Sequence, residues 1–394
     1  MKILQINVSL NSGSTGRITE DIGKVMLRNG FESSIAFGRT ARPSTSEKIR
    51  VGNKLDFYSH VIQTRLFDNH GFASKSATTD LIQKIKDYKP DVIGLHNLHG
   101  YYLHVGVLFE FLKEYACPVV WTFHDCWPFT GHCSHFEKID CQKWKSHCNK
   151  CPLTAFYPQS YIEDNSFKNF VNKKNLFTNH PNLTIITPSN WLAALVKQSF
   201  LKEYSVQVIH NGTNLEILKP RGIENNSIVL GVASVWTKSK GLDDFIQLRK
   251  ILDFQIEIVL IGLSKKQIKV LPKGILGIEK TESLEQLAVW YSRASVFINP
   301  TYADNFPTTN IEALACGTPV ITYNTGGSPE AIDHETGVIV EKGDILGLER
   351  AIHELGFKDQ NQLGLKCRER AEKYFNKNER FTEYFILYQK LINT

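Results

Sequence analysis

Short apolar runs alternate along the chain with longer amphipathic segments. The runs KILQIN, SSIAFG, DVIGLH, PVVWTFH, LTIITPS and VQVIHNG are typical of buried strands. Helical periodicity lies between them, for example over residues 19–29 and 79–88. Strands that alternate with helices in this way predict an α/β fold with a doubly wound parallel sheet.

The same pattern restarts after NGTNLEILKPRGIENN, a stretch rich in Gly, Asn and Pro. SIVLGVAS, IEIVLIG, LGIEK, VFINP and PVITYN predict a second set of strands, with a helix near 242–252. The chain has 394 residues, which is enough for two separate cores. We therefore expect two α/β domains that meet near residue 205.

The last segment, 378–392, carries an apolar stripe at the i, i+3, i+4, i+7 spacing of an amphipathic helix. The residues of the stripe are Phe381, Tyr384, Phe385, Tyr388, Leu391 and Ile392.

The composition excludes a disordered chain, because 42% of the residues are hydrophobic and only 22% are charged. A net charge of +6 is lower than a dedicated nucleic-acid binder normally has, yet it suits an anionic ligand or membrane surface. The first residues, MKILQINVSLNSGSTG, indicate a strand and a glycine turn rather than a signal peptide. No run reaches the ~18 apolar residues of a spanning helix. We expect a cytoplasmic protein that can lie on a membrane surface.

Five of the eight cysteines fall in HDCWPFTGHCSHFEKIDCQKWKSHCNKCP, residues 124–152. Cys133, Cys141, Cys148 and Cys151 end in a C-x-x-C, a spacing that lets two thiolates of one loop reach one tetrahedral ion. In a reducing cytosol this predicts a structural zinc site. Free or oxidised thiols are the alternative, and a zinc module that binds a nucleic acid or a protein is another interpretation of the cluster.

Two loops after predicted strands suit a phosphate-bearing ligand. NSGSTGRITEDI places Gly13 and Gly16 between a strand and a helix, where backbone amides can approach a phosphate. VASVWTKSKGLDDF places Lys238 and Lys240 before a helix, where an ammonium can meet a diphosphate. A glycine turn without a ligand and a solvated basic turn are the corresponding alternatives.

The segment PTYADNFPTTNIEALACGTPVITYNTGGSPEAI carries the strongest signal. Asp304 lies before the helix predicted at 308–316, and Glu312 lies on that helix, eight positions later. The helix N-terminus attracts anions. Two carboxylates beside it can grip a polyhydroxylated ligand around its phosphate.

This segment resembles the acid-x7-acid motif of the retaining glycosyltransferases of family 4, which have the GT-B fold. SGSTGRI, TFHD, TPSNW, IHNGTN, the Lys-Gly pair at 240–241 and GGSPEAI follow in that family's order, so the resemblance spans nearly the whole chain. The cysteine segment further resembles the colanic-acid-type branch, which assembles bacterial surface polysaccharides.

The resemblance implies a role for each matching residue. Lys240 would neutralise the donor diphosphate, Gly16 would give its amide close approach, and Glu312 would hold the ribose hydroxyls. Asp304 would hold the sugar, and His124 would approach the sugar near the reacting carbon. No catalytic metal is required. The full set implied at the nucleotide-sugar is Gly16, Arg17, Lys238, Lys240, Ile278, Asn305, Phe306, Pro307, Thr308, Thr309 and Glu312.

Two positions depart from the family pattern. Asp304 stands where the family has Glu, one methylene longer. Val235 stands where an arginine is usual, five residues before the lysine, and Trp236 or Lys238 would have to compensate.

The resemblance implies an acceptor-side domain of residues 1–205 plus 375–394, with a cysteine-rich insertion at 126–152. Residues 206–374 would form the nucleotide-sugar domain across a cleft, and the final helix would cross back to the first domain. The expected reaction is transfer, with retention, from a UDP- or GDP-sugar to a glycan or lipid-linked glycan, at a peripheral inner-membrane surface and without nucleic acid. The loop at 276–283 is expected to discriminate the base. A GT-B epimerase and a degenerate zinc-binding scaffold remain alternatives.

Overall fold

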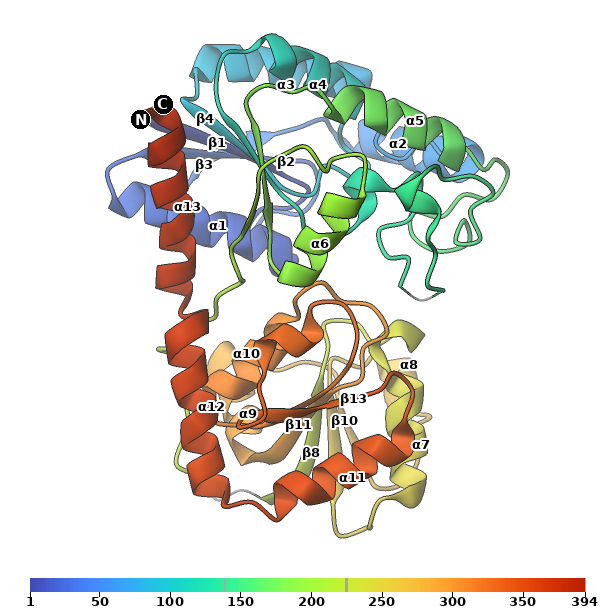
Figure 1. Ribbon diagram of the computed structural model, residues 1–394, viewed down its shortest axis with the longest axis vertical. Helices are drawn as coiled ribbons and strands as arrows, with labels where there is room; N and C mark the ends of the chain where they lie inside the picture. The colour runs from blue at the N-terminus through green and yellow to red at the C-terminus, as the bar shows by residue number, and fades with distance from the viewer. Residues whose placement is uncertain (138, 224–225, 394) are drawn as a thin grey trace. The chain divides into compact units, whose positions relative to one another are not determined.

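The computed structural model describes residues 1–137, 139–223 and 226–393 (Figure 1). The chain forms two compact units. Met1–Ile209 and Phe381–Thr394 make the first unit, and His210–Arg380 make the second. Each unit is built on one parallel sheet with helices on both faces.

The sheet of the first unit has seven strands among the described residues, in the order β3-β2-β1-β4-β5-β6-β7. They are β1 (Lys2–Asn7), β2 (Glu32–Phe37), β3 (Glu47–Arg50), β4 (Val92–Leu95), β5 (Val119–Thr122), β6 (Leu183–Thr187) and β7 (Val206–Val208). The helices are α1 (Gly13–Arg28), α2 (Lys54–Phe67), α3 (Lys75–Tyr88), α4 (Val105–Glu114), α5 (Ser166–Phe177), α6 (Asn190–Gln198) and α13 (Lys377–Ile392), with 3-10 turns η1 (Trp127–Phe129) and η2 (Lys143–Lys145).

The sheet of the second unit has six strands in the described part of the chain, in the order β10-β9-β8-β11-β12-β13. They are β8 (Asn226–Val232), β9 (Glu257–Ile261), β10 (Ile275–Ile278), β11 (Ala294–Asn299), β12 (Val320–Tyr323) and β13 (Gly337–Val340). The helices are α7 (Leu242–Ile251), α8 (Lys265–Ile268), α9 (Leu284–Arg293), α10 (Thr308–Ala315), α11 (Ile345–Gly356) and α12 (Gln360–Phe375), with 3-10 turns η3 (Lys238–Lys240) and η4 (Ser328–Ala331).

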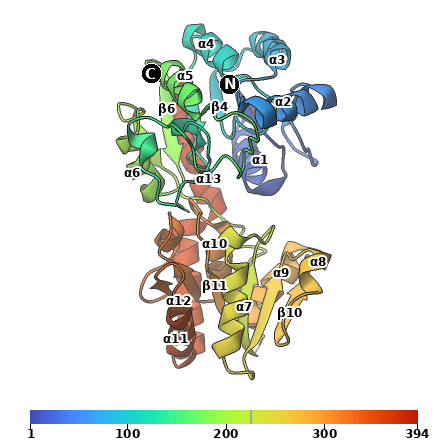
Figure 2. The same ribbon diagram turned by 90° about the vertical axis from the view of Figure 1, so that its right-hand side faces the viewer.

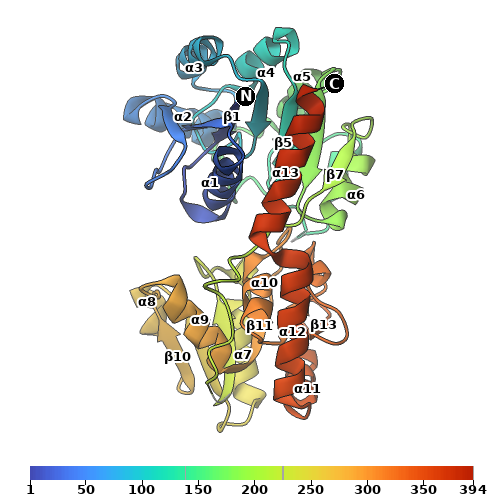
Figure 3. The ribbon, with the colours of Figure 1, turned by 90° about the vertical axis from the view of Figure 1, so that its left-hand side faces the viewer.

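Successive strand residues of the first unit enter two different cores, as the pleat of a strand requires. Leu4 and Val119 pack in one core, whereas their neighbours Ile3 and Val120 pack in the other. The second of these cores also contains residues of α1 and of α13. Figure 3 shows α13 beside α1 on this face of the sheet. The expected α/β fold and the return of the final helix to the first unit are confirmed.

Three details differ from the sequence-based expectation. β3 was not expected because it is a polar edge strand, with Glu47 and Lys48 exposed. β13 was not expected either, although it pairs with β12 along its full length. β7 pairs with β6, so residues 206–209 belong to the first unit and not, as expected, to the second.

Both sheets have a switch point, where the strand order reverses: between β1 and β4 in the first unit and between β8 and β11 in the second. Ligands of open α/β sheets bind beyond the carboxyl ends of such strands. Figure 2 shows α7, β11 and α10 as neighbours in the second unit. The loop after β8 leads to α7, and the loop after β11 leads to α10. Among the described helices, none has the length and apolarity needed to cross a membrane.

Candidate functional site

An ion pair lies at the switch point of the second unit. Lys240 ends η3, in the loop after β8, and Asp304 lies in the loop after β11. Lys240 Nζ is 2.6 Å from Asp304 Oδ2, and their side chains are 34% and 20% exposed. Two loops far apart in the sequence thus present a cation and a carboxylate together, with part of each still open to solvent.

The backbone fixes these two loops to each other. Tyr302 N donates to Ser239 O over 2.9 Å, one residue before Lys240. Gly241 has φ +75°, and a Cβ there would lie 2.3 Å from Pro300 O. Glycine is therefore required at 241 both for its dihedral angle and for the close approach of the second loop.

The second carboxylate, Glu312, is held by a neutral partner. Tyr291 on α9 donates its hydroxyl to Glu312 Oε2 over 3.2 Å. Tyr291 is fully buried, and burial raises the pKa of its phenol well above the usual value, with the Glu312 charge adding to the effect. Tyr291 therefore stays a hydrogen-bond donor, and it orients Glu312 without neutralising its charge.

The chain between the two acids forms the start of α10. Asn305 and Phe306 are buried, with Phe306 stacked on His210 at 4.9 Å between ring centroids. Pro307 precedes the helix and provides no side-chain cap, and Thr308 and Thr309 form its half-buried first turn. First-turn amides without a side-chain cap attract an anion.

The other residues that the resemblance implies at the nucleotide differ in how accessible they are to a ligand. Lys238 is exposed in η3 and is free to reach an anion. Trp236 is buried, and its indole Nε1 donates to Ile261 O over 2.9 Å, so it does not compensate for Val235. Ile278 ends the edge strand β10, and its carbonyl already accepts from the amide of Gly262 (2.9 Å).

In the first unit, His124 belongs to a pair of histidines at the ends of neighbouring strands. His124 follows β5 and His96 follows β4, and His124 Nε2 is 3.0 Å from His96 Nδ1. Burial lowers the pKa of His124 to about 4, while the charge of Asp125 opposes this shift. His124 is therefore a neutral imidazole at physiological pH.

A second pair lies on the same two loops. His99 Nε2 is 2.6 Å from Asp125 Oδ2, and His99 Nδ1 is 3.0 Å from the Tyr157 hydroxyl. Burial alone would raise the pKa of Asp125, but the neighbouring His99 and its hydrogen bond bring it down to about 2. Asp125 is therefore an ionised, buried carboxylate.

In the glycine loop after β1, close packing requires a glycine at position 16. A Cβ at Gly16 would lie 2.8 Å from Ser9 Oγ and 3.0 Å from Ser9 O. The next residue, Arg17, is exposed, and its Nε donates to Gly13 O over 3.2 Å. Gly16 is needed for the turn of the chain after β1 whether or not a ligand binds there.

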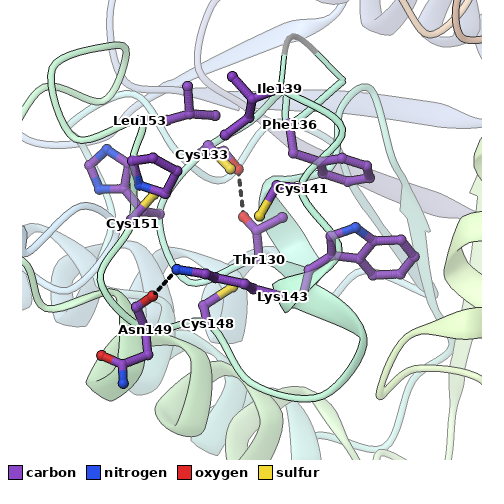
Figure 4. A pocket seen from close by; sticks show the side chains of 13 residues that line it. Thr130, Cys133, Phe136, Ile139, Cys141, Lys143, Cys148, Asn149, Cys151 and Leu153 are labelled. Carbon is purple, nitrogen blue, oxygen red and sulfur yellow. Dashed lines mark hydrogen bonds between the residues drawn. The ribbon is translucent and has the colours of Figure 1, made fainter.

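The cysteine segment encloses a small cavity (Figure 4). Cys133, Cys141, Cys148 and Cys151 all line it, together with aromatic and aliphatic side chains. Gly131 N donates to Cys148 Sγ over 3.2 Å, and all four cysteines are free thiols. Within the described ranges, no three or more His, Cys, Asp or Glu side chains have the placement that a metal ion needs. Zinc at this segment stays a prediction.

Sequence reasoning named Lys240 and Asp304, which pair with each other, but it did not name the partners of Glu312 and His124. His96 and His99 lie in HNLHG, directly after a predicted strand, and the same strand-end rule would have found them. Tyr291 lies on a helix and carries no such signal.

Comparison with known proteins places the chain in a family. Residues 15–217 match Glycosyltransferase Family 4, and residues 226–356 match Glycosyl transferases group 1. A protein of Escherichia coli K12 named as a colanic acid biosynthesis glycosyl transferase, WcaC, is 23% identical over 368 residues, which cover 88% of this chain and 89% of that protein.

Two solved structures resemble the whole chain. Sucrose-phosphate synthase of Thermosynechococcus elongatus has a TM-score of 0.71 at 18% identity, covering 100% of this chain and 99% of that one. HepE of Anabaena, solved with UDP, has a TM-score of 0.69 at 15% identity, covering 99% and 100%. At these identities the likeness shows the fold alone, and it confirms GT-B. Because the first family match covers more than half of the sequence, the chain belongs to glycosyltransferase family 4.

Proposed function

We propose that this chain transfers a sugar from a nucleotide diphosphate donor to a glycan or lipid-linked glycan, with retention at the anomeric carbon, in bacterial polysaccharide biosynthesis. The observation that carries the proposal is the Lys240–Asp304 pair at the switch point of the second unit, with Glu312 on the adjoining helix. Membership of a glycosyltransferase family supports it, and so does the similarity to the colanic acid biosynthesis glycosyl transferase of Escherichia coli.

The charges suit such a donor. The bond from the anomeric carbon to the diphosphate oxygen breaks while a bond to the acceptor oxygen forms, and the acceptor proton passes to the departing diphosphate. Negative charge thus develops on the diphosphate, and Lys240, exposed Lys238 and the α10 amides are the groups that meet it. Asp304 and Glu312 offer acceptors to hydroxyls of the sugar and the ribose.

The donor is a UDP- or GDP-sugar, and a likeness in fold to a protein solved with UDP supports this class. His124 of the first unit meets the sugar. A preorganised ammonium and helix dipoles take the place that a catalytic metal ion has in other transferases. The acceptor is held at the first unit, on a peripheral membrane surface, and the cysteine segment shapes its choice.

A panel of nucleotide sugars tests the proposal. The full chain is heated with UDP-, GDP- and dTDP-sugars, since a ligand that binds the folded state raises the melting temperature by mass action. We expect one nucleotide class to raise the melting temperature and the free nucleotide diphosphate to raise it as well. No shift with any of the three classes would contradict the proposal.

A further inference from the structure

A chain of hydrogen bonds runs through the interior of the first unit and ends at His124. Gln5 on β1 donates through Nε2 to Thr19 O over 2.8 Å. Gln5 Oε1 is 3.1 Å from His96 Nε2. His96 Nδ1 is in turn 3.0 Å from His124 Nε2. Gln5, Thr19 and His96 are all buried, so water does not compete for these bonds.

The direction of each bond follows from what its ends can do. The carbonyl of Thr19 only accepts, so the amide nitrogen of Gln5 faces it and the amide oxygen faces His96. That oxygen also only accepts, so the proton of His96 lies on Nε2. The tautomer of His96 is therefore set by the carbonyl of Thr19 on α1, acting through the side chain of Gln5.

The same reasoning reaches His124. Burial lowers the pKa of His96 well below its usual value, with His124 adding to the shift, so His96 carries one proton and its Nδ1 accepts. His124 Nε2 must then donate to it. Burial also lowers the pKa of His124 to about 4, against the opposing charge of Asp125 and with the help of His99, so no second proton sits on Nδ1 at neutral pH.

We propose that Gln5 and His96 are positioning residues that hold His124 in the tautomer with its proton on Nε2. Any hydrogen bond that His124 makes through Nδ1, to the protein or to a ligand, is then one that it accepts. A ligand group that meets this nitrogen has to be a donor such as a hydroxyl, and a carboxylate or phosphate oxygen is rejected. This inference rests on the proposed function only where it takes that hydroxyl to belong to the donor sugar.

The neighbouring pair provides a matched control. His99 and Asp125 lie on the same two loops as His96 and His124, and they pair at 2.6 Å. His99 makes no hydrogen bond to Gln5 or His96 among those described for it, which join it to Asp125 and Tyr157. Changing His99 disturbs the loops equally but leaves the chain from Thr19 to His124 intact.

The first test needs no mutation in the protein that is measured. The full chain is labelled with ¹⁵N-histidine, and long-range proton–nitrogen spectra report which ring nitrogen carries the proton, with assignments from His96→Asn and His124→Asn. We expect both residues to carry it on Nε2, with no change between about pH 6 and 8. A proton on Nδ1 of His124, whether in the neutral tautomer or in the imidazolium ion, would overturn the proposal.

The second test removes the cause. Gln5→Met keeps a similar length but replaces the amide oxygen with a thioether, which is only a weak acceptor. The tautomers of His96 and His124 then lose the bond that sets them. We expect the single set of ring signals for both histidines to split or broaden, whereas His99→Gln retains the single set. Wild-type tautomers in Gln5→Met would remove Gln5 as a positioning residue. If this variant does not fold, the wild-type spectrum decides.

A titration with UDP-glucose and GDP-mannose separates this inference from the proposed function. Binding that shifts the Nδ1 signal of His124 while the proton stays on Nε2 supports the ligand contact. Binding without any change at His124 overturns it. If neither compound binds, and no nucleotide sugar of a wider panel binds, the proposed function fails. The tautomer result in the free protein then stands by itself.

Discussion

At the residue scale, the two carboxylates of the second unit differ in what holds them. Asp304 faces the ammonium of Lys240 at 2.6 Å, so its charge is opposed within the protein. Glu312 accepts a hydrogen bond from the phenol of Tyr291, a neutral partner that does not oppose its charge. Asp304 is therefore suited to hold Lys240 in place through one oxygen while it accepts from a sugar hydroxyl, and Glu312 is suited to accept from ribose hydroxyls.

Glu312→Gln tests this difference. The ribose hydroxyls would lose a charged acceptor worth ~1.5–3 kcal/mol. We expect the donor dissociation constant, measured by calorimetry, to rise roughly ten- to hundredfold. Glu369→Gln is the control, because that side chain is 67% exposed on α12 and lies outside the site. An unchanged affinity in Glu312→Gln would exclude it from the nucleotide site.

The residues of the site were predictable to different degrees for a physical reason. Asp304 and Lys240 lie in the loops that follow β11 and β8, so their place at the carboxyl edge could be predicted from the hydrophobic pattern. The hydrogen bonds that lead to His124 could not. Gln5 and His96 are 91 positions apart, and their contact exists only because β1 and β4 are neighbours in the sheet. Sequence periodicity indicates strands but not which strands pair.

At the element scale, the cysteine segment is ordered by an aromatic core of its own. Trp144 is 1% exposed, and its ring stacks on Phe136 with centroids 5.0 Å apart and contacts Phe129 at 5.3 Å. Regular structure in the described part of this segment is limited to η1 and η2. The spacing of cysteines indicated a cluster, and the structure adds the packing that the pattern could not predict.

The predicted zinc is tested by metal analysis of freshly reduced protein. We expect about one zinc per chain, because structural sites of this kind are four-coordinate with cysteine ligands. Cys148→Ser and Cys151→Ser should lose it, while Cys117→Ser, a buried cysteine outside the segment, should keep it. Protein that is reduced and folded but holds no zinc would contradict the prediction.

Acid should destabilise the first unit through its buried histidines. Burial lowers the pKa of His60 to about 3 and that of His124 to about 4, and it lowers those of His70 and His96 well below the usual value of 6.5. The unfolded chain therefore binds more protons than the folded one below pH 6.5. The stabilisation is complete above that pH and is lost as the pH falls toward 4.

The measurement is the free energy of unfolding in urea across this pH range. We expect it to fall steadily from about pH 6.5 downward, and to fall less steeply in His60→Gln. Unfolding free energies that stay constant between about pH 7 and 5 would show that these histidines titrate alike in the folded and the unfolded chain, which contradicts the lowered pKa values.

At the scale of the whole molecule, the chain leaves the first unit after Ile209 and returns to it at Phe381. The returning helix packs against the sheet of the first unit. Tyr388 is fully buried, and its hydroxyl would lie 2.7 Å from a Cβ at Gly94 on β4. The apolar stripe at 378–392 predicted this helix, and only the resemblance implied where it packs.

Tyr388→Ala tests how much the first unit depends on α13. Removing a buried aromatic ring leaves a cavity and costs ~3–5 kcal/mol. We expect a clear fall in the urea midpoint, whereas Ile386→Ala, on the same helix but 59% exposed, should change it little. Removal of residues 377–394 should leave the apolar face of α1 bare and the protein aggregated. A monomeric, cooperatively folded truncation would contradict this account.

The most direct test of the central claim follows the sugar itself. The full chain is supplied with a nucleotide sugar labelled with ¹³C at the anomeric carbon and with a lipid-linked glycan acceptor, and the product is examined by NMR. We predict a new glycosidic bond with the anomeric configuration of the donor, formed far more slowly by Asp304→Asn and Glu312→Gln. An inverted product, or wild-type transfer by both variants, would contradict the account.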